Sequence, residues 1–419
     1  MIPIHEQPYP LPDGWQWVHI VDVCNFIGGG TPSKDIASYW SGDIPWASVK
    51  DIKGDYLFDT ADKITEAGLK NSSANLCEID NLILVTRIEP GKSIVAKIVS
   101  AVNQDLKIVK SSLPAKFLHY FFKSVRQEIE LMSSGSTVKG ITLKKLENFP
   151  FPLPPLDEQQ RIVALLDELF ADLDEAKALA QAVVDGSELR RTAILHKAFT
   201  GELSQLWREE HGTTLDSWQR RTVASVCKGL IYGTSKKSKS FGKMIVLRMG
   251  NIQCGKIDWK DLAYSDDEAD IKKYLLSKGD VLFNRTNSAE LVGKTSIYRG
   301  EYPAIYAGYL IKLDYDRDVL SGEYLNYVLN SPAAKEYCNH VKTDGVNQSN
   351  INAKKIGAYV IPLPPPEEQK EIVRLLDDLL GREQQTKNLA GKTLEHIEIL
   401  RKSILSRVFR GELVLGEQF

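Results

Sequence analysis

Residues 152–169 read PLPPLDEQQRIVALLDEL, and residues 362–379 read PLPPPEEQKEIVRLLDDL. The two copies align without a gap as far as residues 203 and 413, with 23 identities in 52 positions. Both copies close with the tripeptide GEL. A repeat of this length predicts that one chain contains two copies of the same structural unit.

Each copy predicts an extended lead-in followed by a long helix. The PLPP run cannot be helical, because proline lacks the amide donor and restricts the residue before it. The acidic pair that follows favours the first turn of a helix, and apolar residues then recur at spacings of three and four. A helix over residues 158–199 would be ~63 Å long at ~1.5 Å per residue. Gly186, Gly381 and Gly391 are the points where such helices could bend or break.

The narrow apolar stripe on each helix must be covered by something. An antiparallel, coiled-coil-like pair of the two copies, related by a pseudo-twofold axis, explains why both helices are long. The alternative is that each helix packs only on its own globular domain. Both arrangements remain open from the sequence.

The repeat continues upstream in weaker form. The pairs WQ, VC and GT recur at one offset of 203 residues, beginning at Trp15 and Trp218 for the first pair. We expect these two tryptophans to be core anchors rather than stacking platforms. The chain therefore divides into two globular domains, 1–150 and 206–358, and two helical repeats, 151–205 and 359–419.

The globular parts predict a mixed α/β or α+β fold. The runs NLILVTRI (81–88) and DVLFNRT (280–286) are apolar, β-rich and bounded by turn residues. The stretches FLHYFFKSVRQEIELM (117–132) and GEYLNYVLNSPAAKEYC (322–338) have helical periodicity. We expect a sheet to form much of each core.

The composition excludes several classes of protein. The 419 residues contain no apolar run of 18, and the first residues lack the basic and apolar regions of a secretory signal, which favours the cytoplasm. The five cysteines include no CxxC pair, so we expect free thiols and no zinc site.

The net charge of −2 hides an uneven distribution. Residues 217–257 contain nine basic residues and no acidic one. Such a block is typical either of a surface that faces a polyanion or of a solvated basic loop. The charge pattern alone does not separate these interpretations.

The doubled PLPPLxEQxxIVxxLD segment, each time behind a globular domain, resembles the specificity subunit of type I restriction-modification enzymes. LPDGWQ (11–16) with GGGTPSKDIASYWSGDIPWASVKDI (28–52) looks like the opening of that family's recognition domain. SKGDVLFNRTNSAELVGKTSIY (277–298) resembles the matching stretch of a second domain. The resemblance covers essentially the whole chain, although the segments after Arg87 and Arg285 differ in length and content.

The resemblance implies two domains that each read one half of a split site in double-stranded DNA. It also implies that the helical repeats separate the domains and dock two methyltransferase subunits, and that a motor–nuclease subunit can join. S-adenosylmethionine, ATP and Mg would then belong to the partners, with none of these cofactors in this chain. No membrane is involved.

Candidate DNA contacts follow from side-chain chemistry. Lysine and arginine suit phosphates, arginine suits guanine, and asparagine or glutamine suits adenine. The candidates in the first domain are Lys34, Arg87, Lys92, Ser136, Thr137 and Lys139. Those in the second domain are Arg220, Arg221, Lys236, Lys237, Lys239, Lys243, Arg285, Asn287, Gln348 and Asn350.

The sequence contains no complete, recognisable catalytic motif. VGKT (292–295) and AGKT (390–393) lack the first glycine of a phosphate loop, and the latter lies within a predicted helix. We therefore expect a chain that catalyses nothing alone. Two alternatives remain: a stand-alone DNA-binding regulator that uses the same two readers, and an enzyme whose site has no recognisable motif.

Overall fold

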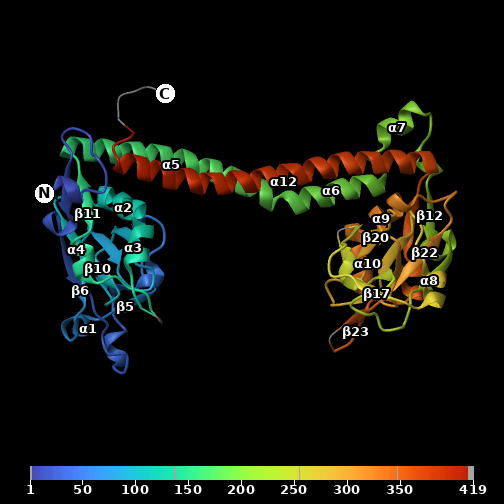
Figure 1. Cartoon of the computed structure of the whole chain (residues 1–419), viewed down its shortest axis with the longest axis horizontal. Helices are drawn as coiled ribbons and strands as arrows, with labels where there is room; N and C mark the ends of the chain where they lie inside the picture. The colour runs from blue at the N-terminus through green and yellow to red at the C-terminus, as the bar shows by residue number, and fades with distance from the viewer. Residues whose placement is uncertain (1, 136–137, 254, 347, 414–419) are drawn as a thin grey trace. The chain divides into compact units, whose positions relative to one another are not determined.

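The computed structural model describes residues 2–135, 138–253, 255–346 and 348–413. The chain divides into two compact units. The first unit contains Met1–Gln181 together with Lys392–Phe419, and the second contains Ala182–Gly391 (Figure 1). Each unit therefore combines one globular domain with parts of both helical segments.

The first domain is built on two sheets, with strand orders β2-β10-β7-β8-β4 and β5-β3-β9-β6. The strands of the larger sheet are β2 (Cys24–Gly28), β4 (Tyr56–Leu57), β7 (Leu82–Val85), β8 (Ser93–Ala96) and β10 (Leu106–Ser111). Those of the smaller sheet are β3 (Ile44–Ala47), β5 (Asp62–Ile64), β6 (Asn75–Cys77) and β9 (Ser100–Val102). All residues of β7, β8 and β9 are buried, as the apolar sequence of β7 predicts.

The second domain repeats this order with one edge strand fewer in each sheet. Its main sheets run β13-β22-β18-β20 and β17-β14-β21. The strands are β13 (Cys227–Tyr232), β14 (Met244–Leu247), β17 (Ala263–Ser265), β18 (Val281–Asn284), β20 (Thr295–Ile297), β21 (Ala304–Tyr306) and β22 (Leu310–Tyr315). The weak upstream repeat of the sequence therefore corresponds to a shared topology.

A two-stranded antiparallel ribbon leads from each domain into its long helix. In the first domain β1 (Gln16–His19) pairs with β11 (Pro150–Leu153), and in the second β12 (Gln219–Thr222) pairs with β25 (Val360–Leu363). The prolines at the end of each ribbon stop the pairing, and the helix begins within three residues. Trp15 is buried in the first core and Trp218 packs against the second, as expected for anchors.

Each of the two predicted domain helices is in fact a pair. Residues 117–132 fall in α2 (Ala115–Ser124) and α3 (Arg126–Met132). Residues 322–338 fall in α9 (Gly322–Leu329) and α10 (Pro332–Val341). In the second pair the break has a local cause, because Pro332 occupies the start of α10 and Ser331 Oγ accepts the Ala334 amide at 3.2 Å.

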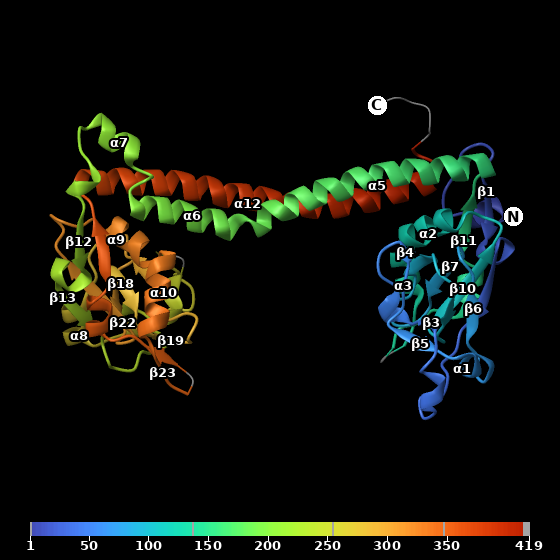
Figure 2. The same ribbon diagram turned by 180° about the vertical axis from the view of Figure 1, so that it is seen from behind.

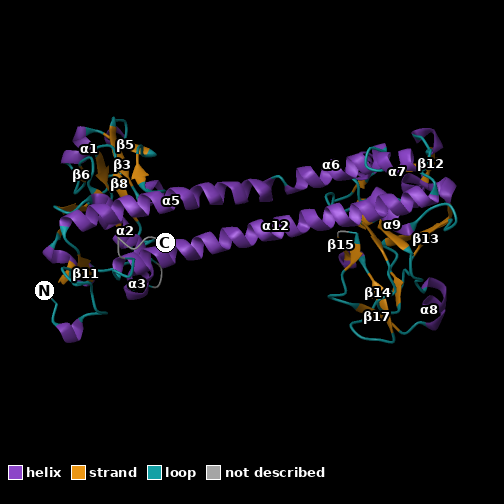
Figure 3. Cartoon of the chain, turned by 90° about the horizontal axis from the view of Figure 1, so that it is seen from above, coloured by secondary structure: helices purple, strands orange, loops and turns teal. Residues whose placement is uncertain are grey.

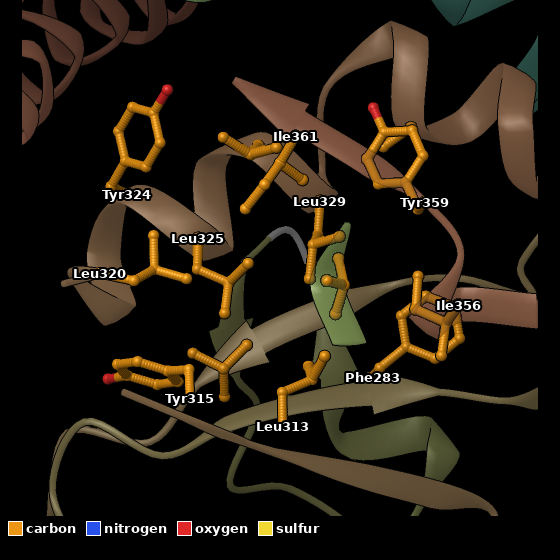
Figure 4. Packing of buried hydrophobic residues seen from close by; sticks show 14 of the residues in the cluster. Phe283, Leu313, Tyr315, Leu320, Tyr324, Leu325, Leu329, Ile356, Tyr359 and Ile361 are labelled. Atoms are coloured by element: carbon orange, nitrogen blue, oxygen red, sulfur yellow. The ribbon is translucent and has the colours of Figure 1, made fainter. Parts of the chain in front are cut away.

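Side chains of α9 fill the space above the main sheet of the second domain. Figure 4 shows Leu325 and Leu329 close to the sheet residues Phe283 and Leu313. Ile361 of β25 belongs to the same buried cluster. The ribbon, the helix and the sheet thus share one core.

The long helices are α5 (Leu156–Asp185), α6 (Ser187–Thr200) and α12 (Pro366–Phe409). The predicted helix over 158–199 is therefore interrupted at Gly186, although helical hydrogen bonds continue across it, from Gly186 N to Ala182 O at 3.0 Å and from Arg190 N to Gly186 O at 3.1 Å. In α12, by contrast, Gly381 and Gly391 leave the helix unbroken. The packing of α12 against its neighbours outweighs the low helical propensity of these two glycines.

Within the first unit, α5 and the last part of α12 run antiparallel (Figure 3). Lys177 Nζ lies 2.6 Å from Glu398 Oε1, and Arg401 pairs with Asp174. Arg401 also donates to the carbonyl of Phe170 at 3.3 Å. Partner numbers fall along α12 as they rise along α5, which defines the antiparallel direction.

The helices of the first unit also complete its domain core. The buried cluster that contains Phe117, Phe121 and Phe151 includes residues from both helices. They are Ile162, Leu166 and Phe170 from α5, and Leu405, Val408 and Phe409 from α12. The sequence left two arrangements open, pairing of the helices and packing of each helix on its domain. Each occurs in part, because the helical stretches contact each other and the domain.

The second unit has the same construction. Arg190 of α6 makes two hydrogen bonds of 3.0 Å to the carboxylate of Glu383 in α12. Leu195 and Ala198 of α6 share a buried cluster with Leu376 of α12 and the sheet. The helical stripe is covered by the partner helix and by the domain together.

A buried ion pair fixes the start of α12. Glu368 accepts hydrogen bonds from Arg208 at 2.6 Å, Ser204 at 2.8 Å and Trp218 at 2.8 Å. The Glu368 and Arg208 side chains are 0% and 6% exposed. Arg208 lies on a short helix, α7 (Gln205–Glu210), that the sequence analysis did not predict.

We predict that Glu368→Gln destabilises the second unit by about 3 to 5 kcal/mol, because Arg208 then remains buried without a counter-charge. The matched control is Glu367→Gln, since Glu367 is exposed and pairs with Lys370 at the surface. That change should cost less than about 1 kcal/mol. Urea unfolding of both variants measures the difference, and equal effects would show that the buried pair does not stabilise the helix start.

Candidate nucleic-acid interface

The second domain contains a cleft of about 900 Å³. It is bordered by residues 234–238, residues 248–251, Asp258, Lys260 and Asp261, Arg285 and Thr286, and residues 307–309. Five cations line it: Lys236, Lys237, Arg248, Lys260 and Arg285. Asp258 and Asp261 are the acidic side chains of the lining. A cleft with this excess of positive charge favours a polyanionic ligand.

Arg285 follows the last residue of β18 and is held from three sides. Its guanidinium lies 4.8 Å from the ring centre of Tyr232. One terminal nitrogen lies 3.4 Å from the carbonyl of Gly308, and the other lies 3.3 Å from Asn350 Oδ1. The Tyr232 hydroxyl in turn accepts the Ala353 amide at 2.9 Å. Stacking and hydrogen bonding therefore orient the guanidinium plane.

The predicted amide residues lie on or beside a small sheet next to Arg285. This sheet consists of β19 (Thr286–Asn287), β24 (Ser349–Asn350) and β23 (Thr343–Asp344). Asn350 donates from Nδ2 to Thr286 Oγ1 at 2.8 Å, so both ends of its amide have partners. Asn287 Oδ1 accepts the Ser288 amide at 2.9 Å, whereas Gln348 is exposed. The structure thus brings these three residues and Arg285 into one region.

The basic block is only partly available to a ligand. Lys236 pairs with Asp267 at 2.5 Å, Lys239 with Asp266 at 2.9 Å, and Lys243 with Glu268 at 3.3 Å. The hydrogen bond to Asp267 raises the pKa of Lys236, and the bond from Lys239 lowers the pKa of Asp266. Acidic residues distant in sequence therefore pair with these three lysines, and their contact with DNA stays a prediction. Among the described residues, Lys237 makes no ion pair.

Arg220 and Arg221 do not join the cleft. They lie on β12, at the end of the domain next to α12. The strand β23 lies at the opposite end of the domain (Figures 1 and 2). Arg221 donates to Ser225 Oγ and Gln219 Oε1 at 3.3 Å. Both arginines are exposed. A single DNA surface that includes these two residues together with the cleft is not supported by their positions.

In the first domain, Arg87 lies beside Lys139 and Gly140. Arg87 forms a β-bridge with Gly140, and the Ile88 amide donates to the carbonyl of Lys139 at 2.8 Å. Arg87 pairs with Asp105 at 3.2 Å and keeps 52% of its side chain exposed. Lys139 is exposed. Ser136 and Thr137 lie outside the described residues.

The other two cations of the first domain differ from each other. Lys34 is exposed on the segment after β2. Lys92 pairs with Glu89 at 3.0 Å and is 28% exposed. Of these two cations, only Lys34 is exposed and without an ion pair among the described residues.

Sequence alignment places Arg87 opposite Arg285, but the structure does not. The Thr86 amide bonds to Asp105 O and its carbonyl accepts the Ile141 amide. Arg285 makes the same pair of bonds, with Tyr309 O and the Ile351 amide. Thr86 is thus the structural counterpart of Arg285, and Arg87 that of Thr286. A shift of one residue turns a side chain to the opposite face of a strand.

A β-bulge in the edge strand β13 also shifts the alignment of the two halves by one residue. β13 has an irregularity between Cys227 and Gly229. Beyond it Gly233 matches Gly29 rather than Gly30, since a Cβ at Gly29 or at Gly233 would lie 2.2 Å from a carbonyl oxygen of an adjacent segment. Glycine is required at both positions for this close approach. The bulge adds one residue to the second copy, which sequence alignment cannot locate.

Sequence reasoning also missed three side chains of the cleft. Arg248 was noted only as part of the basic block, and Lys260 and Tyr309 were not candidates. Tyr309 is 47% exposed at the turn between β21 and β22. Its place between the apolar runs AIYA (304–307) and LIKL (310–313) was the available signal for it.

One constellation in the first domain has the composition of a hydrolytic triad. Ser93 Oγ lies 3.0 Å from His119 Nδ1, and His119 Nε2 lies 3.2 Å from Asp55 Oδ1. Ser93 and His119 are 4% and 1% exposed, so a substrate has no access to the hydroxyl. Burial lowers the pKa of His119, and the hydrogen bond from His119 lowers the pKa of Asp55. The cluster therefore acts as a buried structural network.

The described part of the chain contains neither a candidate metal site nor a helix suited to span a membrane. Within it, no cluster of His, Cys, Asp or Glu has the arrangement needed to hold a metal ion. None of the described helices combines the length and the apolar character needed to cross a bilayer. Lys294 of the VGKT segment donates to Gln253 Oε1 at 2.9 Å, and AGKT lies within α12.

Comparison with known proteins gives one consistent result. The model of the type I restriction modification DNA specificity domain matches residues 12–182 and 216–396. The specificity subunit of the type I restriction enzyme EcoKI from Escherichia coli K12 is 29% identical, over 96% of this chain and 90% of that protein. The StySPI specificity subunit from Salmonella potsdam is 27% identical, with the same coverage of both chains.

Two solved structures have a similar fold. A chain from a type I restriction-modification system has a TM-score of 0.72 at 22% identity, and covers 97% of this chain and 100% of its own length. The HsdS subunit from Thermoanaerobacter tengcongensis has a TM-score of 0.67 at 20% identity, with coverage of 98% and 100%.

We predict that Lys237→Ala weakens binding of the full chain to duplex DNA more than Lys239→Ala does. Lys237 has no acidic neighbour within ion-pair distance, whereas Asp266 already balances Lys239. Loss of one phosphate contact should reduce the slope of log K against log salt by about 0.9. Fluorescence anisotropy over a salt series gives both slopes, and equal slopes for the two variants would contradict this assignment.

Proposed function

The chain belongs to the type I restriction-modification DNA specificity family, and from this premise we propose that it is the subunit that selects the DNA sequence in such a complex. The observation that carries the proposal is the pair of domains with one strand order and different side chains at the same position. A reader of an asymmetric split site needs this combination. Homologues are specificity subunits, so chemistry on the DNA belongs to partner subunits.

In this proposal residues 1–150 and 206–358 are the two recognition domains, and each reads one half of a bipartite site. The cleft around Arg285 serves the second domain, and the region around Arg87 and Lys139 serves the first. Phosphate contacts by exposed lysines orient the duplex, and side chains at the sheet edge discriminate bases. The two half-sites differ because these side chains differ.

The segments 151–205 and 359–419 would act as the spacer. Within each unit the helices contact their own domain and an antiparallel partner, which supports a rigid connection between domain and helix. A rigid spacer would impose a set gap between half-sites, as dimeric DNA readers do through their half-site spacing. The repeat would also present two equivalent surfaces, and thereby dock two methyltransferase subunits.

The assembled complex would methylate adenine within the recognised site in the cytoplasm. S-adenosylmethionine would be held by the methyltransferase subunits, and ATP with Mg by a motor–nuclease subunit that joins through them. The chain itself would contribute no reacting group.

Titration of the chain with its methyltransferase subunits tests the proposal. We expect adenine methylation at a split motif in the mixture and none with either component alone, as read by methylome sequencing of a host plasmid. A chain that binds DNA specifically while the mixture fails to methylate would instead be a regulator. Exchange of residues 13–150 for the domain of a relative should change one half-site only.

We further predict that removing residues 171–177 together with 396–402 shortens the gap between half-sites. These stretches face each other in the first unit, through the pairs Lys177–Glu398 and Asp174–Arg401. Seven residues correspond to two turns and about 10 Å, or roughly three base pairs. Methylome sequencing should find both half-sites unchanged at the new distance. An unchanged gap would mean that the helices do not set the spacing.

A further inference from the structure

We propose that Arg285 reads a guanine in the half-site of the second domain, and that Asn350 positions it rather than reading a base itself. This inference rests on the proposed function, and it assigns one base-reading group to one domain. It also separates two side chains that the sequence suggested as equal candidates.

The support around Arg285 is unusual for a surface cation. Tyr232, Gly308 and Asn350 approach it from β13, from the turn after β21 and from β24. A long side chain loses considerable freedom when it is fixed on binding, and prior fixation removes that cost. The two hydrogen bonds, at 3.3 and 3.4 Å, are long and orient the group without saturating it.

The remaining donors of Arg285 match guanine. Each terminal nitrogen of a guanidinium carries two N–H groups, and only one on each nitrogen is used by Gly308 or Asn350. The other N–H on each nitrogen lies in the same guanidinium plane, and a planar pair of such donors can bind O6 and N7 of guanine in the major groove. The side chain also lines the cleft, where Lys237 and Lys260 can contact the flanking phosphates.

Asn350 is engaged at both ends of its amide. Its Oδ1 accepts from Arg285 and its Nδ2 donates to Thr286 Oγ1. These two bonds hold the amide between Thr286 and the guanidinium. In this proposal the role of Asn350 is therefore to orient Arg285.

The polar groups at this strand end are costly for stability. Asn284 is fully buried, and both atoms of its amide lack a partner, as does Nε of Arg285. Buried polar atoms without partners are rare in proteins and commonly mark functional sites. The structurally equivalent residues of the first domain are Val85 and Thr86, which create no such cost. This polar end of β18 therefore belongs to the second domain alone, and Arg87 of the first domain is engaged by Asp105.

The test uses the complete complex with its methyltransferase subunits and compares Arg285→Lys with Arg285→Ala by methylome sequencing. Lysine keeps the charge and loses the fork. For both variants we expect one position of one half-site to lose its preference for guanine by about 5- to 150-fold, with the other half-site unchanged. The unchanged half-site shows that the complex is folded and assembled.

The matched control is Arg299→Ala, which removes an exposed guanidinium of the same domain that pairs with Glu323 outside the cleft. It should leave the motif unaltered. Asn350→Ala should weaken the preference at the same position as Arg285→Lys, because loss of a positioning residue acts through the reader.

Three outcomes would overturn the assignment. An unchanged motif in both Arg285 variants would show that no base is read there. A uniform loss of methylation across all sites, in complexes that still assemble, would make Arg285 a phosphate contact. Altered preference at an adenine would assign it to another base. Failure of the wild-type complex to methylate a split motif would instead refute the proposed function itself.

Discussion

The structure depends on one narrow apolar helix face that packs against two partners. In each unit a helical stretch packs at once against its antiparallel neighbour and against the domain core. Phe170 and Phe409 belong to the same buried cluster as Phe121, although they come from three distant parts of the chain. A helix with so narrow a stripe cannot be stable alone in water, so its packing partners supply most of its stability. The domains are consequently not independent of the helices, and each unit contains pieces of both helical repeats.

The same scaffold carries two different surfaces. The strand order, the ribbon and the helix pairing agree between the halves. The side chains at the end of β18, beside the cleft, differ from those at the end of β7. The bulge in β13 and the shift of one residue after β18 change which side chains reach the sheet edge. Small changes in register therefore alter the chemistry of the surface while the core keeps its packing. This combination lets one fold present two unlike recognition sites.

Much of the scaffold could be predicted from the sequence, because periodicity and proline act locally. The repeated PLPP segment predicted both long helices, and Trp15 and Trp218 were identified as core anchors. The candidate site was less accessible. The pairing of Lys239 with Asp266 joins two residues outside the strands that are 27 positions apart, and no spacing rule reveals it. Arg208 was missed because its partner Glu368 lies 160 residues away. Identical letters at Arg87 and Arg285 concealed a shift that only backbone hydrogen bonds disclose.

The composition of the first core has a consequence for how the chain is made. Phe117, Phe121 and Phe151 emerge from the ribosome long before Leu405 and Phe409, which complete their cluster. At about 5 to 20 residues per second, translation separates Phe170 from Phe409 by roughly 10 to 50 s. Throughout that interval the nascent first domain lacks its last apolar cover while the second domain is being synthesised. Its aromatic surface must be shielded by chaperones or by transient contacts, and premature termination would leave that surface permanently exposed.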